Sequence, residues 1–238
     1  MSLGIVVFAR IGSARLPGKV LADLGGRTLL QRVLDRVRIV AGAAVVVATS
    51  DCIEDDPIAL QAASEHVEVF RGSLIDVADR ALSAADAFGL DRFARVCADR
   101  PFVDPVLIRR ALERSVESGA DLVSTTRPAD EPHCSPTPTV PPGLTTEVIR
   151  TDALRELLMT TDDPADREHV TRAFYRFASP FSHALVEAGP GARTRPLVVD
   201  TAADLRRARA VTQHLGSEPH RAAMMEVARA MHSVWLDE

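Results

Sequence analysis

Aromatic residues are scarce in this sequence: its 238 residues include one Trp, one Tyr and eight Phe. A hydrophobic core therefore has to be built from the smaller side chains of Ala, Val and Leu. Hydrophobic residues as a whole reach 46 % and charged residues 26 %, which are ordinary values for a globular protein. The length suits one large α/β domain, or a domain that carries a small subdomain.

An excess of positive charge is also missing. The chain has 28 Lys and Arg against 33 Asp and Glu, which gives a formal net charge of −5 at pH 7. Proteins that bind nucleic acids need a basic field that neutralises phosphates. We therefore expect no nucleic-acid partner, and any anion that the protein holds must be met by positive charge gathered locally.

Two further absences concern location. No hydrophobic run approaches the length of a membrane span, and the N-terminus lacks the basic segment and cleavage site of a signal peptide. The three cysteines, Cys52, Cys97 and Cys134, have neither C-x-x-C spacing nor an even number. These absences favour a cytoplasmic protein with reduced thiols and no membrane contact.

Short apolar segments alternate with segments of helical periodicity along most of the chain. In residues 28–38, for example, apolar residues recur on one helical face and polar residues on the other. This α/β alternation predicts a mostly parallel, twisted sheet flanked by helices, with ligands at the carboxyl ends of the strands. The predicted strands are residues 3–8, 43–49, 67–70, 93–98, 121–126, 144–149 and 196–199. The other predicted helices begin at Asp104 or span residues 152–160, 166–177, 202–215 and 220–235.

A proline-rich stretch, RPADEPHCSPTPTVPPG at residues 127–143, interrupts this alternation. So many prolines exclude a helix or a central strand and predict an irregular excursion over the surface. We expect a single domain over residues 1–238, with an inserted smaller lobe at about residues 127–190 and C-terminal helices within residues 202–235.

The stretch VFARIGSARLPGK, which includes the end of the first predicted strand, gathers positive charge and flexible backbone. It matches neither a P-loop nor a Rossmann glycine pattern. Backbone N–H groups around Gly12 and Ser13, together with Arg10, Arg15 and Lys19, suit a polyphosphate at the carboxyl end of a parallel strand. The alternative is a solvated basic turn whose lysine caps a helix.

These residues resemble the N-terminal signature of the sugar cytidylyltransferases, in which R-x-G-S-x-R-x-P-G-K follows the first strand. That family includes enzymes that activate acylneuraminates and KDO, and the spore-coat polysaccharide protein class. Further blocks resemble the family in the same order along the chain: VVVATS, VFRGSLIDVADR, RVCADRPFVDPVLI, GADLVS, GLTTEVIRTDAL, DREHVT and VVDTAADLRRAR.

The resemblance implies a GT-A-like nucleotidyltransferase fold and a homodimer formed through the inserted lobe. It also implies a reaction in which CMP passes from CTP to a nucleophilic oxygen of an acidic or amino sugar, with release of pyrophosphate, in surface-polysaccharide synthesis. Three alternatives stay open: a different nucleoside triphosphate, a non-sugar acceptor, or a non-catalytic relative that binds a nucleotide or a sugar.

Two aspartates at predicted strand ends are the expected metal ligands. The resemblance implies that Asp99 and Asp200 bind Mg²⁺, which prefers one or two carboxylates with phosphate oxygens and water. The alternative is that each aspartate only caps the following helix. The residues expected to act directly in catalysis are Arg10, Lys19 and Asp99.

The resemblance also assigns residues around the nucleotide and the sugar. The alternative for Arg71 and Arg80 is that they are surface arginines paired with Asp76 or Asp79. The expected nucleotide-binding residues are Arg10, Gly12, Ser13, Arg15, Lys19, Ser50, Arg71, Ser73 and Arg80. The expected sugar-binding residues are Arg100, Glu147, Arg167, Glu168 and His169.

The chain departs from the family's pattern at two places. Cys97, Ala98 and Arg100 surround Asp99 where similar proteins carry Thr-Gly before the aspartate and a small or acidic residue after it. Thr145 stands where an aspartate is usual. Arg100 could influence Asp99, reach into the sugar pocket to hold a carboxylate, or point outward.

Overall fold

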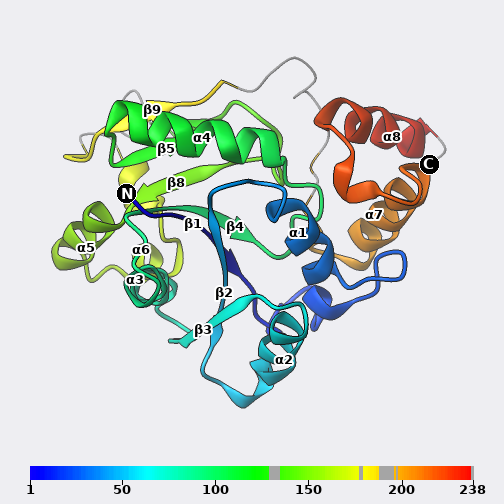
Figure 1. The fold of residues 1–238 in the computed structure, drawn as a ribbon, viewed down its shortest axis with the longest axis horizontal. Coiled ribbons are helices and arrows are strands. Elements are labelled where there is room, and N and C mark those ends of the chain that lie inside the picture. The colour runs from blue at the N-terminus through cyan, green and yellow to red at the C-terminus, as the bar shows by residue number, and fades with distance from the viewer. Residues whose placement is uncertain (129–134, 177–178, 188–195, 197, 237–238) are drawn as a thin grey trace.

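The computed structural model describes residues 1–128, 135–176, 179–187, 196 and 198–236. Its centre is a seven-stranded sheet with the order β3-β2-β1-β4-β8-β5-β9 (Figure 1). Strands β1 to β4 are parallel, β8 is antiparallel to β4 and β5, and β9 is parallel to β5. The predicted mostly parallel sheet is therefore confirmed. The strands are β1 (Leu3–Phe8), β2 (Ala44–Ser50), β3 (Glu68–Gly72), β4 (Arg92–Cys97), β5 (Leu122–Ser124), β8 (Glu147–Arg150) and β9 (His183–Leu185).

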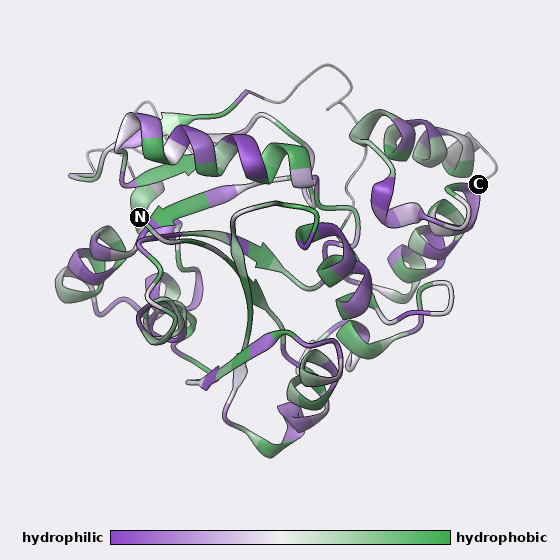
Figure 2. Ribbon diagram, in the orientation of Figure 1, coloured by the Kyte–Doolittle hydropathy of each residue, from purple (hydrophilic) through white to green (hydrophobic). Residues whose placement is uncertain are grey.

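Helices cover both faces of the sheet and give the protein three layers (Figure 1). In β1, Ile5 and Val7 pack into the core on one face, and Val6 and Phe8 into the core on the other. Figure 2 shows that the central strands are largely hydrophobic, as expected for strands buried on both faces. The helices of the first face are α1 (Leu29–Val37), α2 (Asp56–Ser64), α4 (Pro105–Ser118), α7 (Ala202–His214) and α8 (Met224–Leu236). Those of the second face are α3 (Val77–Ala87), α5 (Thr151–Thr160) and α6 (Pro164–Glu168).

The start of α1 shows how local sequence sets an element's bounds. Thr28 is the N-cap, and its side chain accepts a hydrogen bond from the backbone N–H of Gln31 while the Gln31 side chain accepts from the Thr28 N–H. This capping box satisfies two backbone donors at the helix N-terminus. The apolar residues that follow, among them Leu30 and Val33, are fully buried.

Three predicted elements differ from the structure. The helix predicted for residues 166–177 is divided: α6 ends at Glu168, and a separate 3₁₀ turn covers Arg172–Tyr175. The buried carboxylate of Asp166 accepts hydrogen bonds from both Arg172 and Arg176. These side-chain contacts override the helical periodicity of the segment.

The strand predicted for residues 196–199 is not found in the part of that segment that the structure describes. Residue 197 lies outside the described residues, and residues 196, 198 and 199 are not in a strand. The Val199 N–H donates to the carbonyl oxygen of Asp99 at 2.9 Å. The last predicted helix also differs, because a 3₁₀ turn over Pro219–Arg221 precedes α8.

The proline-rich stretch lies partly outside the described residues, which exclude 129–134 and with them Cys134. Beside that gap, β6 (Thr126–Arg127) and β7 (Thr137–Pro138) form a separate two-stranded ladder. β8, which follows, lies inside the main sheet between β4 and β5. The division into a domain and an inserted lobe stays a prediction.

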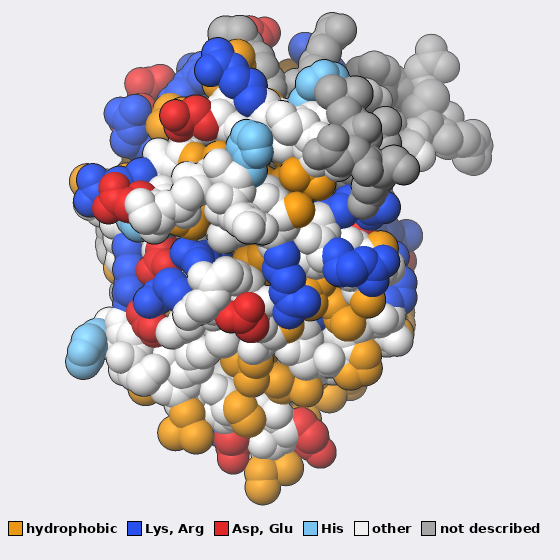
Figure 3. Space-filling view, turned by 90° about the vertical axis from the view of Figure 1, so that its right-hand side faces the viewer, with side chains coloured by type: hydrophobic (Ala, Val, Ile, Leu, Met, Phe, Trp, Pro, Cys, Tyr) orange, Lys and Arg blue, Asp and Glu red, His pale blue; other side chains and the backbone are white. Residues whose placement is uncertain are grey.

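The surface combines charges of both signs. Figure 3 shows Lys and Arg interspersed with Asp and Glu on the face that looks to the right in Figure 1, with hydrophobic side chains toward its lower end. Within the described residues, none of the helices is both long and apolar enough to span a membrane.

Arg36 of α1 joins three distant parts of the chain. It is 1 % exposed, and its guanidinium donates hydrogen bonds to the backbone carbonyls of Val103, Pro219, His220 and Ala222. Burial lowers the pKa of Arg36 to about 10. This pKa is still high enough to keep the side chain charged at neutral pH. The segment before α8 is thereby fixed to α1 and to the loop after β4.

Replacing this arginine by methionine removes the donors and leaves several buried carbonyls without a partner. We expect Arg36→Met to lower the free energy of unfolding by about 2–4 kcal/mol. Urea denaturation measures this change. The matched control is Arg109→Met in α4, because Arg109 is exposed and makes one contact of 3.5 Å with Glu113. Equal stability of the two variants would contradict the role of Arg36.

Candidate functional site

A cavity of about 370 Å³ opens at the carboxyl ends of β1 and β4. From β1 the chain proceeds to β2 and β3 on one side of the sheet, and then returns to β4 on the other side of β1. The connections that follow β1 and β4 therefore diverge at this point of the sheet. Such a reversal in strand order is where open α/β sheets bind ligands.

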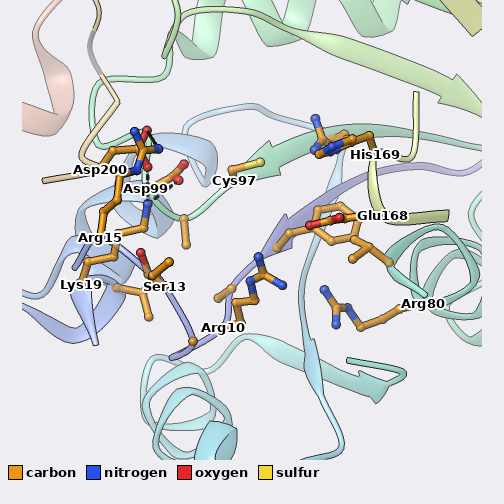
Figure 4. Close-up of a pocket in the computed structure, with 18 residues that line it drawn as sticks. Arg10, Ser13, Arg15, Lys19, Arg80, Cys97, Asp99, Glu168, His169 and Asp200 are labelled. Atoms are coloured by element: carbon orange, nitrogen blue, oxygen red, sulfur yellow. Dashed lines mark hydrogen bonds and ion pairs between the residues drawn. The ribbon is translucent and has the colours of Figure 1, made fainter. Parts of the chain in front are cut away.

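The loop after β1 forms one wall of this cavity. Arg10, Gly12, Ser13, Arg15 and Lys19 all line it, which brings together the five residues that the sequence singled out in this loop. Figure 4 shows the side chains of Arg15, Lys19 and Ser13 on the same side of the pocket.

Lys19 lies at the centre of a charge cluster (Figure 4). Its Nζ is 2.8 Å from Oδ2 of Asp99, 2.8 Å from Oδ1 of Asp200 and 2.9 Å from the carbonyl oxygen of Val199. Arg15 binds the second carboxylate oxygen of Asp200, also at 2.8 Å. Lys19 is buried and uses its side chain for these contacts, so the alternative of a solvated, helix-capping lysine is wrong.

The environment of Lys19 keeps it protonated. Burial alone would lower its pKa, but the charge of Asp99, and then the hydrogen bonds to both carboxylates and the charge of Asp200, outweigh burial and raise the pKa above its usual value. Lys19 is therefore a permanent cation at neutral pH.

The backbone bond from Val199 to Asp99 places Asp200 beside Asp99. Asp200 does not cap α7, because Thr201 is the N-cap and accepts from the N–H of Asp204. Asp99 caps no helix either, since Asp104 caps α4. The capping alternative is therefore wrong for both aspartates.

The two carboxylates fit a magnesium ion only in combination with a ligand. In the part of the chain that the structure describes, no group of three or more His, Cys, Asp or Glu could hold a metal ion. The carboxylates of Asp99 and Asp200 converge on one cation, the Lys19 ammonium, and are hard oxygen donors. Mg²⁺ takes one or two carboxylates and completes its shell with phosphate oxygens and water.

Arg80 contributes a second cation beside Arg10 (Figure 4). It is buried, and its Nη1 donates to the carbonyl oxygen of Ser73 at 2.6 Å. Burial, followed by the positive charge of Arg10, lowers the pKa of Arg80. The pocket thus holds two neighbouring guanidinium groups, an arrangement that favours an anion.

The alternative that paired Arg71 and Arg80 with Asp76 or Asp79 is wrong. Arg71 binds Asp56 at 2.5 Å and donates to the backbone carbonyls of Ser50 and Cys52. Asp76 instead forms an ion pair of 3.2 Å with Arg167.

Three of the predicted nucleotide-binding residues, Ser50, Arg71 and Ser73, lie outside the lining of the pocket. Ser50 is fully buried and its hydroxyl donates to Asp55. The Ser73 hydroxyl accepts from the N–H of Asp76 at the start of α3. These residues brace the connections beside the pocket, and their nucleotide contacts stay predictions.

The opposite end of the pocket carries Glu168 and His169, which lie across from the Lys19 cluster in Figure 4. Both are exposed at the end of α6. Arg167, by contrast, turns away from the pocket lining and donates to the backbone carbonyls of Leu158 and Thr161.

Glu147 lies behind the pocket and acts on it through Arg95. Its buried carboxylate accepts hydrogen bonds of 2.9 Å from Arg95, from the hydroxyl of Thr171 and from the hydroxyl of Tyr175. Burial raises the pKa of Glu147, but the charge of Arg95 and then of Arg100, with the two hydroxyl bonds, lowers it overall. Glu147 therefore fixes Arg95, which lines the pocket, to the segment that follows α6.

Sequence reasoning missed Arg95. The signal that could have found it is an arginine in the middle of a strand whose other residues are mostly buried, since a central strand tolerates such a charge only with a partner.

Comparison with known proteins shows the family to which the chain belongs. The model of the cytidylyltransferase family matches residues 4–233 of the chain. This chain belongs to the cytidylyltransferase family. The family resemblance noted in the sequence is thereby confirmed.

Individual relatives of this cytidylyltransferase differ in how much they share with it. The spore coat polysaccharide biosynthesis protein SpsF of Bacillus subtilis is 30 % identical over 223 residues, which are 90 % of this chain and 88 % of that protein. A 3-deoxy-manno-octulosonate cytidylyltransferase of Idiomarina loihiensis is 31 % identical over 128 residues, which are 48 % of this chain and 45 % of that enzyme. The match therefore spans less than half of the Idiomarina enzyme.

The fold has a similar solved structure. A cytidylyltransferase from Leptospira borgpetersenii superposes with a TM-score of 0.87 at 24 % identity, covering 98 % of this chain and 94 % of that one. At this identity the likeness shows the fold, and the predicted nucleotidyltransferase fold is confirmed.

Two departures from the family's pattern contact each other in this cytidylyltransferase. Nη1 of Arg100 donates to the hydroxyl of Thr145 at 2.8 Å and to its carbonyl oxygen at 3.0 Å. Arg100 is thus turned toward the segment before β8, an orientation that was not among the three considered for it. Arg100 and Thr145 are not among the residues that line the pocket.

Proposed function

We propose that this cytidylyltransferase moves CMP from CTP to a nucleophilic oxygen of an acidic or amino sugar, with release of pyrophosphate and with Mg²⁺ as cofactor. The observation that carries the proposal is the cluster of Lys19, Asp99 and Asp200 at the point where the strand order reverses. Cations for a triphosphate and carboxylates for a divalent ion meet there in one pocket.

The residues of this pocket have distinct proposed tasks. Arg10, Arg15 and Lys19 hold the triphosphate, and backbone N–H groups of Gly12 and Ser13 donate to its oxygens. The same cations stabilise the negative charge that builds up on the departing pyrophosphate.

Asp99 and Asp200 would hold Mg²⁺ once Lys19 moves onto the phosphates. The ion would neutralise phosphate charge and make the α-phosphate a better electrophile. A sugar hydroxyl then attacks the α-phosphate in line with the leaving pyrophosphate.

The other end of the pocket suits the acceptor. Arg95 is a donor for a sugar carboxylate, and Glu168 is an acceptor for an ammonium or a hydroxyl. The names of the relatives support such an acceptor: one is a spore coat polysaccharide biosynthesis protein and another a 3-deoxy-manno-octulosonate cytidylyltransferase. The proposal also includes a role in surface-polysaccharide synthesis, a cytoplasmic location and a homodimer. Light scattering on a sizing column tests the homodimer.

Thermal unfolding with CTP, UTP, GTP or ATP, each with and without Mg²⁺, tests the nucleotide. A ligand at about 100 times its Kd adds about 2.7 kcal/mol of stability, which raises the Tm of a domain of this size by about 5–10 °C. We expect that shift for CTP with Mg²⁺ and a much smaller one for the other nucleotides. A larger shift with UTP or GTP would assign a different nucleotide.

Pyrophosphate release tests the reaction. The assay combines CTP and Mg²⁺ with 3-deoxy-manno-octulosonate, with N-acetylneuraminate or with a neutral or amino hexose. We expect release with an acidic or amino sugar and none with a neutral one. CTP binding without release on any sugar would favour a non-catalytic relative.

A further inference from the structure

Asp55 is a buried carboxylate directly behind the loop that carries the pocket's cations. It is 2 % exposed and ends the 3₁₀ turn Ile53–Asp55 that follows β2. Asp55 is also the N-cap residue of α2, a position at which an aspartate usually accepts from the helix's own first N–H groups. Its side chain makes no such bond. The carboxylate is used elsewhere.

The carboxylate oxygens of Asp55 connect the turn after β2 to the loop after β1, where Ile11 lies 44 residues away in the sequence. Oδ1 of Asp55 accepts from the backbone N–H of Ile11 at 2.7 Å. Oδ2 accepts from the backbone N–H of Ser50 at 3.3 Å and from the Ser50 hydroxyl. The loop after β1 is thereby tied to the carboxyl end of β2.

Ile11 is held on its other side as well. Its carbonyl oxygen accepts from the N–H of Gly18 at 3.0 Å. The peptide groups before and after Ile11 are therefore both fixed, while its neighbours Arg10, Gly12 and Ser13 face the pocket. Ile11 itself is not among the lining residues. The loop is therefore anchored at Ile11, while the residues on either side of it face the pocket.

The charge of Asp55 matters in addition to its geometry. Among the residues that the structure describes, Asp55 takes part in no salt bridge, so its negative charge is not consumed by a neighbouring cation. Burial and the charge of Arg10 lower the pKa of Arg80, and the charges of Asp55 and Asp51 act in the opposite direction. A carboxylate behind the loop thus favours a charged Arg80 beside Arg10.

We propose that Asp55 is the positioning residue of the phosphate-binding loop: by accepting from the Ile11 N–H it holds Arg10, Gly12 and Ser13 where the phosphate chain of a nucleoside triphosphate needs them. This inference rests on the proposed nucleotide site and goes beyond it, because Asp55 touches neither the pocket nor a ligand. Its effect should grow with the number of phosphates on the ligand.

Asp55→Asn tests the proposal, because one carboxylate oxygen becomes an NH₂ group that faces donors. We expect the variant to bind CTP about tenfold more weakly, as for the loss of a hydrogen bond to a charged group. The affinity of the variant for CMP, which has one phosphate, should fall by less than about threefold. Titration calorimetry, with CMP measured by displacement, gives both constants. A merely structural role would leave the ratio of the two affinities unchanged.

Asp121→Asn is the matched control. Asp121 also accepts from a backbone N–H and a serine hydroxyl, those of Ser182 at 2.8 and 2.7 Å, and it binds Arg150 at the β5–β9 side of the sheet. We expect this variant to be less stable in urea, with unchanged affinity for CTP. Equal loss of CTP affinity in both variants would overturn a specific role for Asp55.

Amide hydrogen exchange on the ligand-free wild-type protein needs no variant. The Ile11 amide should exchange at least about tenfold more slowly than those of Gly12 and Ser13, which should become protected when CTP binds. Equally fast exchange at Ile11 would overturn the anchor even if Asp55→Asn failed to fold.

Wild-type protein that binds no nucleoside triphosphate would overturn the proposed function, and the phosphate role of Asp55 with it. CTP binding by the wild type with an unchanged CTP-to-CMP ratio in the variant would overturn the role of Asp55 alone.

Discussion

Replacement of Lys19 by methionine is expected to lower kcat/KM for CTP by about 10²- to 10³-fold. The ammonium lies in a buried pocket where a charge interacts more strongly than in water. Methionine keeps the length of the side chain and removes the charge. It also leaves Asp99 and Asp200 without the cation that they share. Asp200 keeps its ion pair with Arg15, but the triphosphate then meets an uncompensated Asp99 carboxylate.

Steady-state kinetics with the acceptor found in the sugar screen measures this effect, and calorimetry with CTP reports binding without an acceptor. Lys19→Arg is the informative partner variant, because it keeps a positive charge but exchanges the compact ammonium for a planar guanidinium. It should retain part of the CTP affinity. Arg109→Met controls for the loss of an exposed cation. Turnover of Lys19→Met within threefold of the wild type would remove Lys19 from the machinery.

The layout around Lys19 was predictable in outline. Apolar runs of strand length alternate with amphipathic helices, so the parallel sheet and the convergence of Asp99 and the β1 loop at one edge follow from the sequence pattern. The approach of Asp200 was expected from a strand over residues 196–199, whereas the described residues 196, 198 and 199 are not in a strand and the Val199 N–H donates to the Asp99 carbonyl. Local pattern identifies which residues meet more reliably than how the backbone brings them there.

The residues that sequence reasoning missed make contacts across long sequence distances. Arg95 and Glu147 meet because β4 and β8 are antiparallel neighbours, and the periodicity of either segment alone does not specify that pairing. Asp55 was not singled out in the sequence, and the fold shows that this N-cap residue of α2 directs its carboxylate to Ile11. In each case a buried polar group had to find its partner in a segment distant in the chain.

Asp99→Asn is expected to have the second large effect: a loss of at least about 100-fold in Mg²⁺-dependent turnover, because a metal bound through its carboxylates supplies several kcal/mol to the transition state. The same variant should lower the pKa of Lys19. Burial lowers that pKa, and the charge of Asp99 is the largest of the contributions that raise it. Asparagine keeps the shape of the side chain while it removes that charge.

The pKa of Lys19 can be measured directly, because Lys19 is the only lysine in the chain. Protein labelled with ¹⁵N at lysine Nζ should give one resonance to follow against pH. In the wild type the ion pairs stabilise the fold below the ordinary lysine pKa of about 10.4, and that contribution is lost as the pH rises through the higher folded-state pKa. In Asp99→Asn the loss should begin at lower pH. Asp104→Asn, which removes a carboxylate charge at the N-cap of α4, should leave the Lys19 resonance unchanged.

Because Lys19 sits on the carboxylates expected to hold Mg²⁺, the ion and the nucleotide should bind with positive coupling. Mg²⁺ alone has to displace the ammonium, and CTP alone has to draw Lys19 away from Asp99 and Asp200. When both bind, Mg²⁺ compensates the carboxylates that Lys19 leaves, and the triphosphate compensates the Lys19 ammonium. The Tm shift with both ligands should therefore exceed the sum of the separate shifts. Asp99→Asn should reduce this excess, since one of the shared carboxylates is gone. Additive shifts in the wild type, or Mg²⁺-dependent turnover that persists in Asp99→Asn, would mean that the ion binds away from Lys19.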